Sequence, residues 1–431
     1  MKRPVSKSKY ETRLAKLLAG ATLREILILV WSLDVIRSNN SKRQKYARLR
    51  YPKAAFGAQP GDEYFLAPWT LETLVNEALT HPSLSLKAKR RLNTREWGAA
   101  AELYNTLNNL ENAESLDDIP ELGMIDSISR IGWRQFGWQT GYWTRNRFFR
   151  AWSLYVFPEA NHFFLKKHGI SVERFCYTGF AVASQLVRNP AVSQDSSMSR
   201  IGIQDYERDA FFKLTALPNR EARKRAKDLR KGKGQIAYKP SALRAYPLVT
   251  FNREGMRQAY CALPDLLYLR FSDGLFYDLV SNDDLRRHFG ERFEKYTIQI
   301  CRHYFKEPFS VLEEVSYGSK SKRIATPDVR IVQNGKLRVV IECKSRKLPY
   351  KVLSSPKPYQ DNEAAYQDIV KGIVQVWRYA AHTRTGFSKE NLTLASDCVG
   401  VVLTLEPWLQ MSPQATGEVF DSAVEACSEI F

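Results

Sequence analysis

The sequence predicts an α/β protein in which a mainly α-helical, basic N-terminal region precedes a C-terminal core, a mixed sheet of about four strands flanked by helices. Three observations lead to this fold class. Helical periodicity dominates the first 120 or so residues, short apolar strands alternate with helices in the last third, and basic residues are concentrated before residue 281. We expect a helical subdomain over 1–120, a basic, aromatic-rich mixed domain over 121–280 and a third domain over 281–431.

The charge balance favours a polyanionic partner. The chain carries 65 Lys and Arg against 46 Asp and Glu, a formal net charge of +19. Residues 281–431 hold 21 basic and 19 acidic side chains, so nearly all of the surplus lies in residues 1–280. A surplus of this size favours nucleic acid or an acidic membrane surface as the partner, and we expect residues 121–280 to bind nucleic acid or a partner protein.

Several function classes lack their sequence signals. The apolar run over 26–33 is far shorter than the ~20 residues of a bilayer span, and no signal-peptide cleavage site follows it. The cysteines form no Cys-x-x-Cys, the six histidines have no metal-ligand spacing, and no phosphate-binding P-loop motif occurs. We therefore expect a cytoplasmic protein without membrane contact, and a partner subunit would have to supply any NTPase activity.

In the N-terminal region, apolar spacing predicts helices over 10–35, 68–80 and 94–108, and short strands over 246–251 and 266–271. A turn-rich stretch over 117–123 would separate two subdomains. The segment 133–155 interleaves nine aromatic residues with arginines. Base stacking with phosphate pairing uses this composition, and so does a buried helical core with arginines on its solvated face.

The densest basic run lies in a helix-compatible segment over 219–233. Candidate phosphate contacts in it are Arg223, Lys224, Arg225, Lys227 and Arg230. A solvated surface helix is the alternative interpretation.

The last third predicts a definite order of elements: a helix over 285–305, strands over 309–317, 326–332 and 337–343, a long helix over 361–382 and a strand over 399–405. Asp328 lies near the start of the second strand, and Glu342, Cys343 and Lys344 lie at the end of the third. Charged groups at the end of an apolar strand need partners, because an unpaired buried charge is costly. Asp328, Glu342 and the backbone carbonyl of Cys343 can ligate Mg²⁺, for which Mn²⁺ is expected to substitute.

The hairpin between these strands decides whether the two carboxylates can meet. A two-residue turn at Asn334 and Gly335 places Glu342 on the face opposite Asp328. An odd loop, or a bulge of equivalent effect, places both on one face. From the chemistry we predict a three-residue loop over 334–336.

Pro327-Asp328 followed by Glu342-Cys343-Lys344 resembles the signature of the PD-(D/E)XK nuclease superfamily. The resemblance covers about residues 285–410 and implies a restriction-endonuclease-like core. It also implies a helical glutamate at the metal site, for which Glu294 matches and Glu291 competes. A surface ion pair is the other interpretation of Glu294. Gln375 and Tyr379 resemble the Gln-x-x-x-Tyr element of RecB-like and lambda-exonuclease-like enzymes, where it borders the site and contacts DNA.

The resemblance implies metal-assisted phosphodiester hydrolysis by Asp328, Glu342 and Lys344. Lys344 would orient or deprotonate the attacking water, or stabilise the transition state. Arg346 and Lys347 are further candidate phosphate contacts.

We expect a metal-dependent DNA endonuclease, with restriction or defence against phage as its setting. An exonuclease or RNA nuclease of the same fold, and an inactive nucleic-acid-binding or scaffold subunit, are the alternatives. A homo-oligomer and a partner subunit that supplies recognition both stay open.

Overall fold

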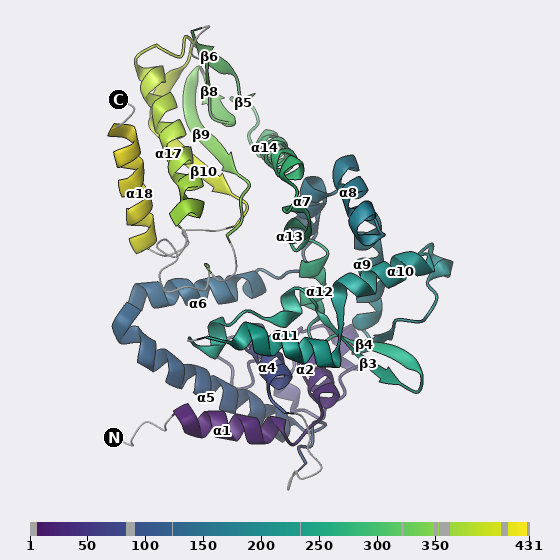
Figure 1. The fold of residues 1–431 in the computed structure, drawn as a ribbon. Helices are drawn as coiled ribbons and strands as arrows, with labels where there is room; N and C mark the ends of the chain where they lie inside the picture. The colour runs from purple at the N-terminus through teal and green to yellow at the C-terminus, as the bar shows by residue number, and fades with distance from the viewer. Residues whose placement is uncertain are drawn as a thin grey trace. The chain divides into compact units, whose positions relative to one another are not determined.

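The computed structural model describes residues 7–82, 91–122, 124–232, 234–319, 323–348, 352, 363–406 and 413–428. The chain folds into two compact units. The first comprises Met1–Leu122 and Arg134–Leu279, and the second comprises Gly123–Trp133 and Val280–Phe431. Figure 1 shows helices and strands in both units, so the α/β class is confirmed.

The first unit is mainly α-helical, as predicted. Its helices are α1 (Lys7–Leu18), α2 (Leu23–Arg37), α3 (Ser41–Gln44), α4 (Pro68–Thr80), α5 (Trp97–Leu122), α7 (Arg145–Tyr155), α8 (Pro158–His168), α9 (Val172–Leu186), α10 (Asp205–Thr215), α11 (Asn219–Arg230), α12 (Pro264–Arg270) and α13 (Leu275–Leu279). The helix α6 (Met124–Gln139) has residues in both units. A small sheet has the order β1 (Ala191–Ser193), β4 (Met256–Tyr260), β3 (Leu248–Arg253), β2 (Ala216–Pro218).

Three predictions for this unit are wrong. The helix expected over 10–35 is two helices, because Thr22 begins α2 with a capping box whose other member is Glu25. The segment 117–122, which was expected to belong to a turn, is helical, because α5 continues to Leu122. The strand expected over 266–271 is α12, which begins at Pro264, a residue whose fixed φ suits the first helical position.

Buried carboxylates in the first unit are matched by cations. The pairs are Glu72 with Arg244 at 2.8 Å, Glu77 with Arg230 at 2.8 Å, Glu111 with Arg134 at 2.6 Å and Glu114 with Lys7 at 3.0 Å. The indole of Trp138 also donates to Glu72, at 3.0 Å. Trp138 is 4% exposed and Arg134 is 9% exposed, so these two members of the aromatic and basic segment belong to the core rather than to a surface.

The second unit is built around a mixed four-stranded sheet, again as predicted. Its elements are α14 (Asp283–Tyr304), β5 (Phe309–Glu313), β6 (Ser316–Gly318), β7 (Arg323–Ala325), β8 (Val329–Gln333), β9 (Lys336–Lys344), α17 (Glu363–Arg384), β10 (Thr393–Thr404) and α18 (Pro413–Ser428). The strand order is β10-β9-β8-β5. β8 is antiparallel to β5 and β9, whereas β10 is parallel to β9, which the intervening helix α17 permits.

The strands before the site are shorter than predicted. The strand expected over 309–317 is divided into β5 and β6, and β6 pairs with β7 in a separate small sheet. The strand expected over 326–332 begins only at Val329, so Asp328 is the residue immediately before β8.

Helices cover both faces of the sheet. Cys343 in β9 contacts Thr297 of α14, with 3.6 Å between the sulfur and the hydroxyl oxygen. α17 packs on the opposite face, where the backbone of Gly400 in β10 lies against Val376. Figure 1 shows α17 and α18 on one side of these strands and α14 on the other. No helix in the part of the chain that the structure describes is long and apolar enough to cross a bilayer.

The close approach at Gly400 gives a test of this packing. A Cβ atom there would lie 2.7 Å from Cγ1 of Val376, a stiff β-branched side chain. We expect Gly400→Ala to lower the free energy of unfolding by about 1–3 kcal/mol, measured by urea unfolding with circular dichroism. The control is Gly417→Ala in α18, where a Cβ meets nothing within 4 Å and should stabilise the helix by roughly 0.5–1 kcal/mol. Equal midpoints for the two variants would contradict the packing.

Candidate active site

The hairpin between β8 and β9 differs from the predicted three-residue loop. Gln333 pairs with Lys336, so Asn334 and Gly335 form a two-residue turn with φ values of +50° and +72°. The register then shifts, because Val332 pairs with Leu337 but Ile331 pairs with Val339. Arg338 is therefore the extra residue of a β-bulge.

The bulge has the effect that an odd loop would have had. Val329 pairs with Ile341, and one further step along the ladder brings Asp328 beside Glu342. Both carboxyl groups then lie on one face of the hairpin, together with Lys344, which is two residues after Glu342. The predicted loop length is wrong, but the juxtaposition that it was meant to produce is present.

Asp328 and Glu342 are both buried, at 6% and 4% exposure. The backbone N–H of Cys343 donates to Oδ2 of Asp328 at 2.5 Å. Burial raises the pKa of Asp328, and burial together with the charge of Asp328 raises the pKa of Glu342. Two buried carboxyl groups thus lie close enough to disfavour each other's ionisation.

Lys344 neutralises only part of this charge. Its ammonium group donates to Oε1 of Glu342 at 2.7 Å and to the amide oxygen of Gln375 in α17 at 2.9 Å. Gly372 makes room for the lysine, since a Cβ there would lie 3.2 Å from Cε of Lys344. Oε2 of Glu342 is buried and has no hydrogen-bond partner among the described residues.

Two more glutamates face these groups. The pKa of Glu294 in α14 is raised to about 7 by burial and by the charges of Asp328, Glu314 and Glu342. Glu291, its competitor, is exposed and lies 3.6 Å from His288, so Glu294 is the glutamate of α14 that the structure places at the site. The sequence prediction missed Glu314, an exposed residue that directly follows β5 and whose pKa is raised by partial desolvation and by the charge of Asp328. The sequence did contain a signal for Glu314: it is the second of two consecutive acidic residues, Glu313 and Glu314, at the end of β5, which lies beside the start of β8.

The arrangement suits a divalent cation. A buried carboxylate oxygen without a partner and several carboxyl groups with raised pKa values mark a place where positive charge is missing. Within the described residues, no three His, Cys, Asp or Glu side chains are arranged as a ready metal-binding group. An ion would therefore be held by Asp328, Glu342 and the Cys343 carbonyl with water completing its shell, as Mg²⁺ prefers.

Gln375 and Tyr379 have different surroundings. Gln375 binds Lys344, whereas Tyr379 is 1% exposed and its hydroxyl donates to Glu390 at 2.7 Å and accepts from Arg330 at 3.2 Å. The expectation that both face a substrate therefore fails for Tyr379, because the buried charge of Arg330 holds its hydroxyl inside the fold.

The two basic residues that follow the site in the sequence also differ in exposure. Lys347 is buried, with its side chain 1% exposed, and pairs with Glu406 at 3.3 Å, so its position does not suit the expected phosphate contact. Arg346 pairs with Asp368 at 3.0 Å, but half of its side chain is exposed. Of these two residues, Arg346 is the one a phosphate could reach.

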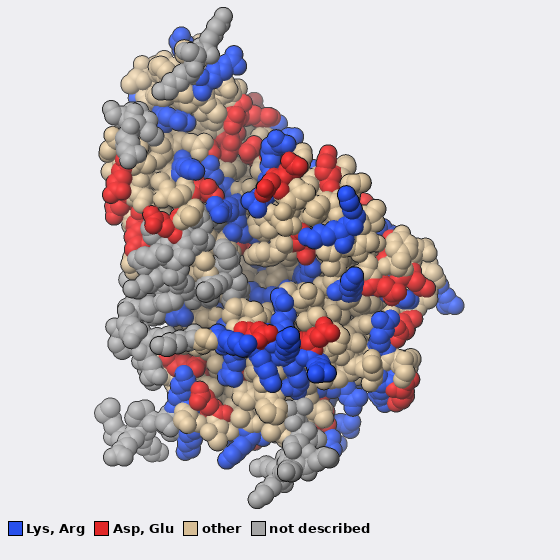
Figure 2. All heavy atoms as spheres, in the orientation of Figure 1, with Lys and Arg blue, Asp and Glu red and all other residues tan. Residues whose placement is uncertain are grey.

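Burial also divides the basic residues of α11, in the first unit, into two groups. Arg223 donates to the carbonyls of Leu79 and His81 at the end of α4, and Arg230 pairs with Glu77. Lys224, Arg225 and Lys227 are exposed, as are Arg220 and Lys231. Figure 2 shows blue side chains gathered over α11. Two of the five predicted phosphate contacts thus hold the fold together, and three face outward.

Comparisons with protein-family models, with curated proteins and with solved structures find no match to this chain. What the site can do is therefore inferred from its geometry and chemistry.

The crowding of carboxyl groups predicts how stability depends on pH without metal. The pKa of Glu294 is raised from 4.5 to about 7, so the folded protein binds this proton more tightly than the unfolded chain and loses stability as pH rises from about 4.5 to 7. We expect Glu294→Gln to raise the thermal unfolding midpoint at pH 7.5 in EDTA, because it should add on the order of 1 kcal/mol to the free energy of unfolding once solvent screening is allowed for.

The advantage of Glu294→Gln should vanish near pH 4, where the wild-type carboxyl is protonated. Glu291→Gln, one turn earlier on α14, should raise the midpoint at pH 7.5 much less, because the charge of Glu291 contributes least among those that raise the pKa of Glu294. An unchanged pH profile in Glu294→Gln would show that these carboxyl groups do not repel one another.

Proposed function

We propose that the chain is a metal-dependent nuclease that hydrolyses phosphodiester bonds, with DNA as its substrate. The observation that carries the proposal is the convergence of Asp328, Glu342 and Lys344, with Oε2 of Glu342 buried and unpartnered. In the first unit Oε2 of Glu77 also lacks a hydrogen bond, but it lies 2.8 Å from the guanidinium of Arg230, whereas Glu342 pairs with Lys344 through its other oxygen, Oε1.

The fold of the second unit supports the same proposal. The order α14, β5, β8, β9, α17, β10 is the order expected for a restriction-endonuclease-like core, with the β6–β7 hairpin inserted before Asp328. Asp328 directly precedes β8, Glu342 lies in the adjacent strand β9, and Gln375 comes from the helix that packs against them.

The residues divide the chemistry among them. Asp328, Glu342 and the Cys343 carbonyl would hold Mg²⁺ or Mn²⁺, which supplies a lowered pKa for the attacking water and positive charge for the transition state. Lys344 has three N–H donors, of which Glu342 and Gln375 take two, so the third can orient a water or a phosphate oxygen. Because the Gln375 oxygen accepts from Lys344, its NH₂ group is left to donate to a phosphate.

Substitutions at the site test this proposal. We expect Glu342→Gln and Lys344→Met each to lower the cleavage rate roughly 100-fold or more, because each removes a group that acts in the transition state. Lys336→Met, on the same strand but at its exposed start, is the matched control and should cleave like the wild type. Mg²⁺ should also raise the thermal midpoint of the wild type more than that of Glu342→Gln. The assignment of Glu342 to the active site is rejected if Glu342→Gln cleaves at the wild-type rate in Mg²⁺ and this cleavage stops in EDTA.

The choice of substrate separates the alternatives. Plasmid, linear duplex, single-stranded DNA and RNA are incubated with the wild-type chain in Mg²⁺ or Mn²⁺. Cleavage of a closed circle identifies an endonuclease, cleavage of linear DNA alone identifies an exonuclease, and cleavage of RNA alone identifies an RNA nuclease. Binding to DNA without any cleavage identifies an inactive binding or scaffold subunit.

The outward cations of α11 predict which residues bind the DNA backbone. We expect Lys224→Ala with Lys227→Ala to weaken DNA binding and to lower the slope of log K against log salt by about 0.9 for each phosphate that the helix no longer neutralises. The control is Lys53→Ala with Lys166→Ala, which removes the same charge from exposed positions elsewhere in the first unit. Equal salt slopes for the two double variants, measured by fluorescence anisotropy, would exclude α11 as the DNA-binding helix.

A further inference from the structure

The strand β10 lies at an edge of the sheet of the second unit. In the order β10-β9-β8-β5, the described residues pair β10 with β9 alone, so its other side presents free backbone N–H and C=O groups. The segment 398–404 contains no charged residue and no proline, and each of its residues is at least partly exposed. Natural edge strands usually carry lysine, proline or a covering element that prevents pairing, and among the described residues β10 has none of these over this segment.

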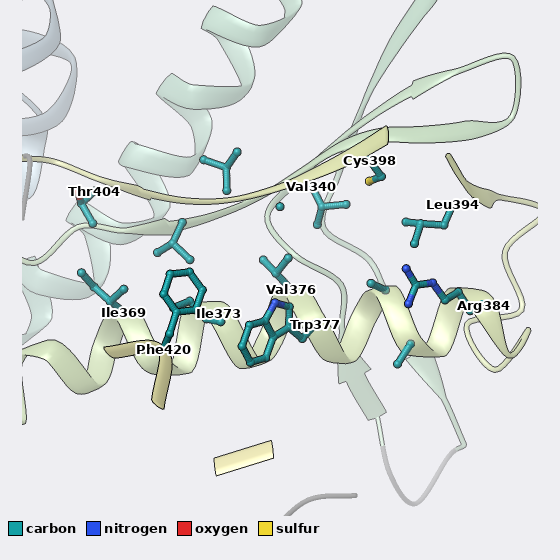
Figure 3. A pocket seen from close by; sticks show the side chains of 15 residues that line it. Val340, Ile369, Ile373, Val376, Trp377, Arg384, Leu394, Cys398, Thr404 and Phe420 are labelled. Atoms are coloured by element: carbon teal, nitrogen blue, oxygen red, sulfur yellow. The ribbon is translucent and has the colours of Figure 1, made fainter. Parts of the chain in front are cut away.

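An apolar groove runs along the same edge. Its volume is about 660 Å³, and it is lined by residues of β10, α17 and α18 and by Val340 of β9 (Figure 3). Trp377 of α17 and Phe420 of α18 stack across it, with ring centroids 6.2 Å apart and planes at 27°. Both rings are exposed, at 36% and 46%, and so are Val399 of β10 at 53% and Val424 of α18 at 56%. Apolar surface gathered in this way is typical of an interaction site.

The two ends of the groove differ in charge. Arg384 lies at the end with Leu394 and Cys398, and Thr404 lies at the other end (Figure 3). Asp397 at the first end is already neutralised by Arg338 at 2.6 Å, which leaves Arg384 as the surplus cation there. Two residues beyond Thr404 lies Glu406, whose carboxylate is 28% exposed although its partner Lys347 is buried.

We propose that a second copy of this chain binds along β10, so that the two β10 strands pair antiparallel about a two-fold axis near Val401. An isologous contact places the same strand opposite itself in reverse direction, and each copy supplies the hydrogen bonds that the other lacks. The axis brings Glu406 of the second copy opposite Leu394–Ser396, where Arg384 lies. Trp377 and Phe420 of each copy flank the seam on the face that α17 and α18 cover. The proposal does not depend on nuclease activity.

Oligomeric state tests the proposal directly. We expect the full-length chain to sediment as a dimer in analytical ultracentrifugation between about 1 and 50 µM, and Val399→Lys to weaken dimerisation at least about tenfold, because it places a charge on the edge. Val315→Lys is the matched control, since Val315 is 45% exposed in the same unit and lies outside β10. Circular dichroism verifies that both variants are folded.

Two more variants test the geometry. Arg384→Glu should weaken the dimer, and the effect should shrink in high salt, because the partner charge is Glu406 of the second copy. Val401→Cys should form a disulfide-linked dimer under mild oxidation more readily than the wild type or Val315→Cys, since Cα atoms of facing antiparallel residues lie within disulfide range. The proposal is overturned if the wild type is monomeric at all concentrations. It is also overturned if Val399→Lys dimerises as strongly as the wild type and Val401→Cys forms no more disulfide-linked dimer than Val315→Cys. An unrelated strand or peptide would then be the candidate occupant of the edge.

Discussion

The hairpin of β8 and β9 contains one extra residue, Arg338, and the placement of Glu342 and Lys344 on the same face as Asp328 depends on it. Side chains alternate between the two faces of a strand, so one inserted residue moves all later side chains to the other face. Without the bulge, Glu342 and Lys344 would face α14 while Asp328 stayed on the side of α17. The bulge is itself held in place, because the Arg338 side chain donates to Gln333 at 3.0 Å and to Asp397 at 2.6 Å.

The two units differ in how their acidic side chains are paired with cations. In the first unit, four buried glutamates of α4 and α5 each contact an arginine or lysine, and the arrangement stabilises the fold. In the second unit, the pKa values of four neighbouring carboxyl groups are raised, and the ammonium of Lys344 hydrogen-bonds to one of them, Glu342. An arrangement that keeps like charges close at a cost in stability is typical of a functional site rather than of a structural ion pair.

The same distinction explains why a count of basic residues overstates the binding surface. Arg223, Arg230 and Lys347 each look like phosphate contacts in the sequence, yet each is occupied by a carbonyl or carboxylate of its own unit. Tyr379 is likewise held by Arg330 and Glu390. What remains for a polyanion is an exposed set, which includes Lys224, Lys227 and Arg346.

The sequence by itself determined the order of α14, β5, β8, β9, α17 and β10 and the grouping of Glu342 with Lys344, because strand alternation and helical periodicity are local properties of the chain, but it did not predict the β6–β7 hairpin or α18. Only the tertiary structure decided the bulge at Arg338, the contact of Gln375 with Lys344 and the approach of Glu314. Each of these depends on residues distant in sequence that meet through packing, and the local pattern carries no information about which side of a neighbouring strand or helix they will meet.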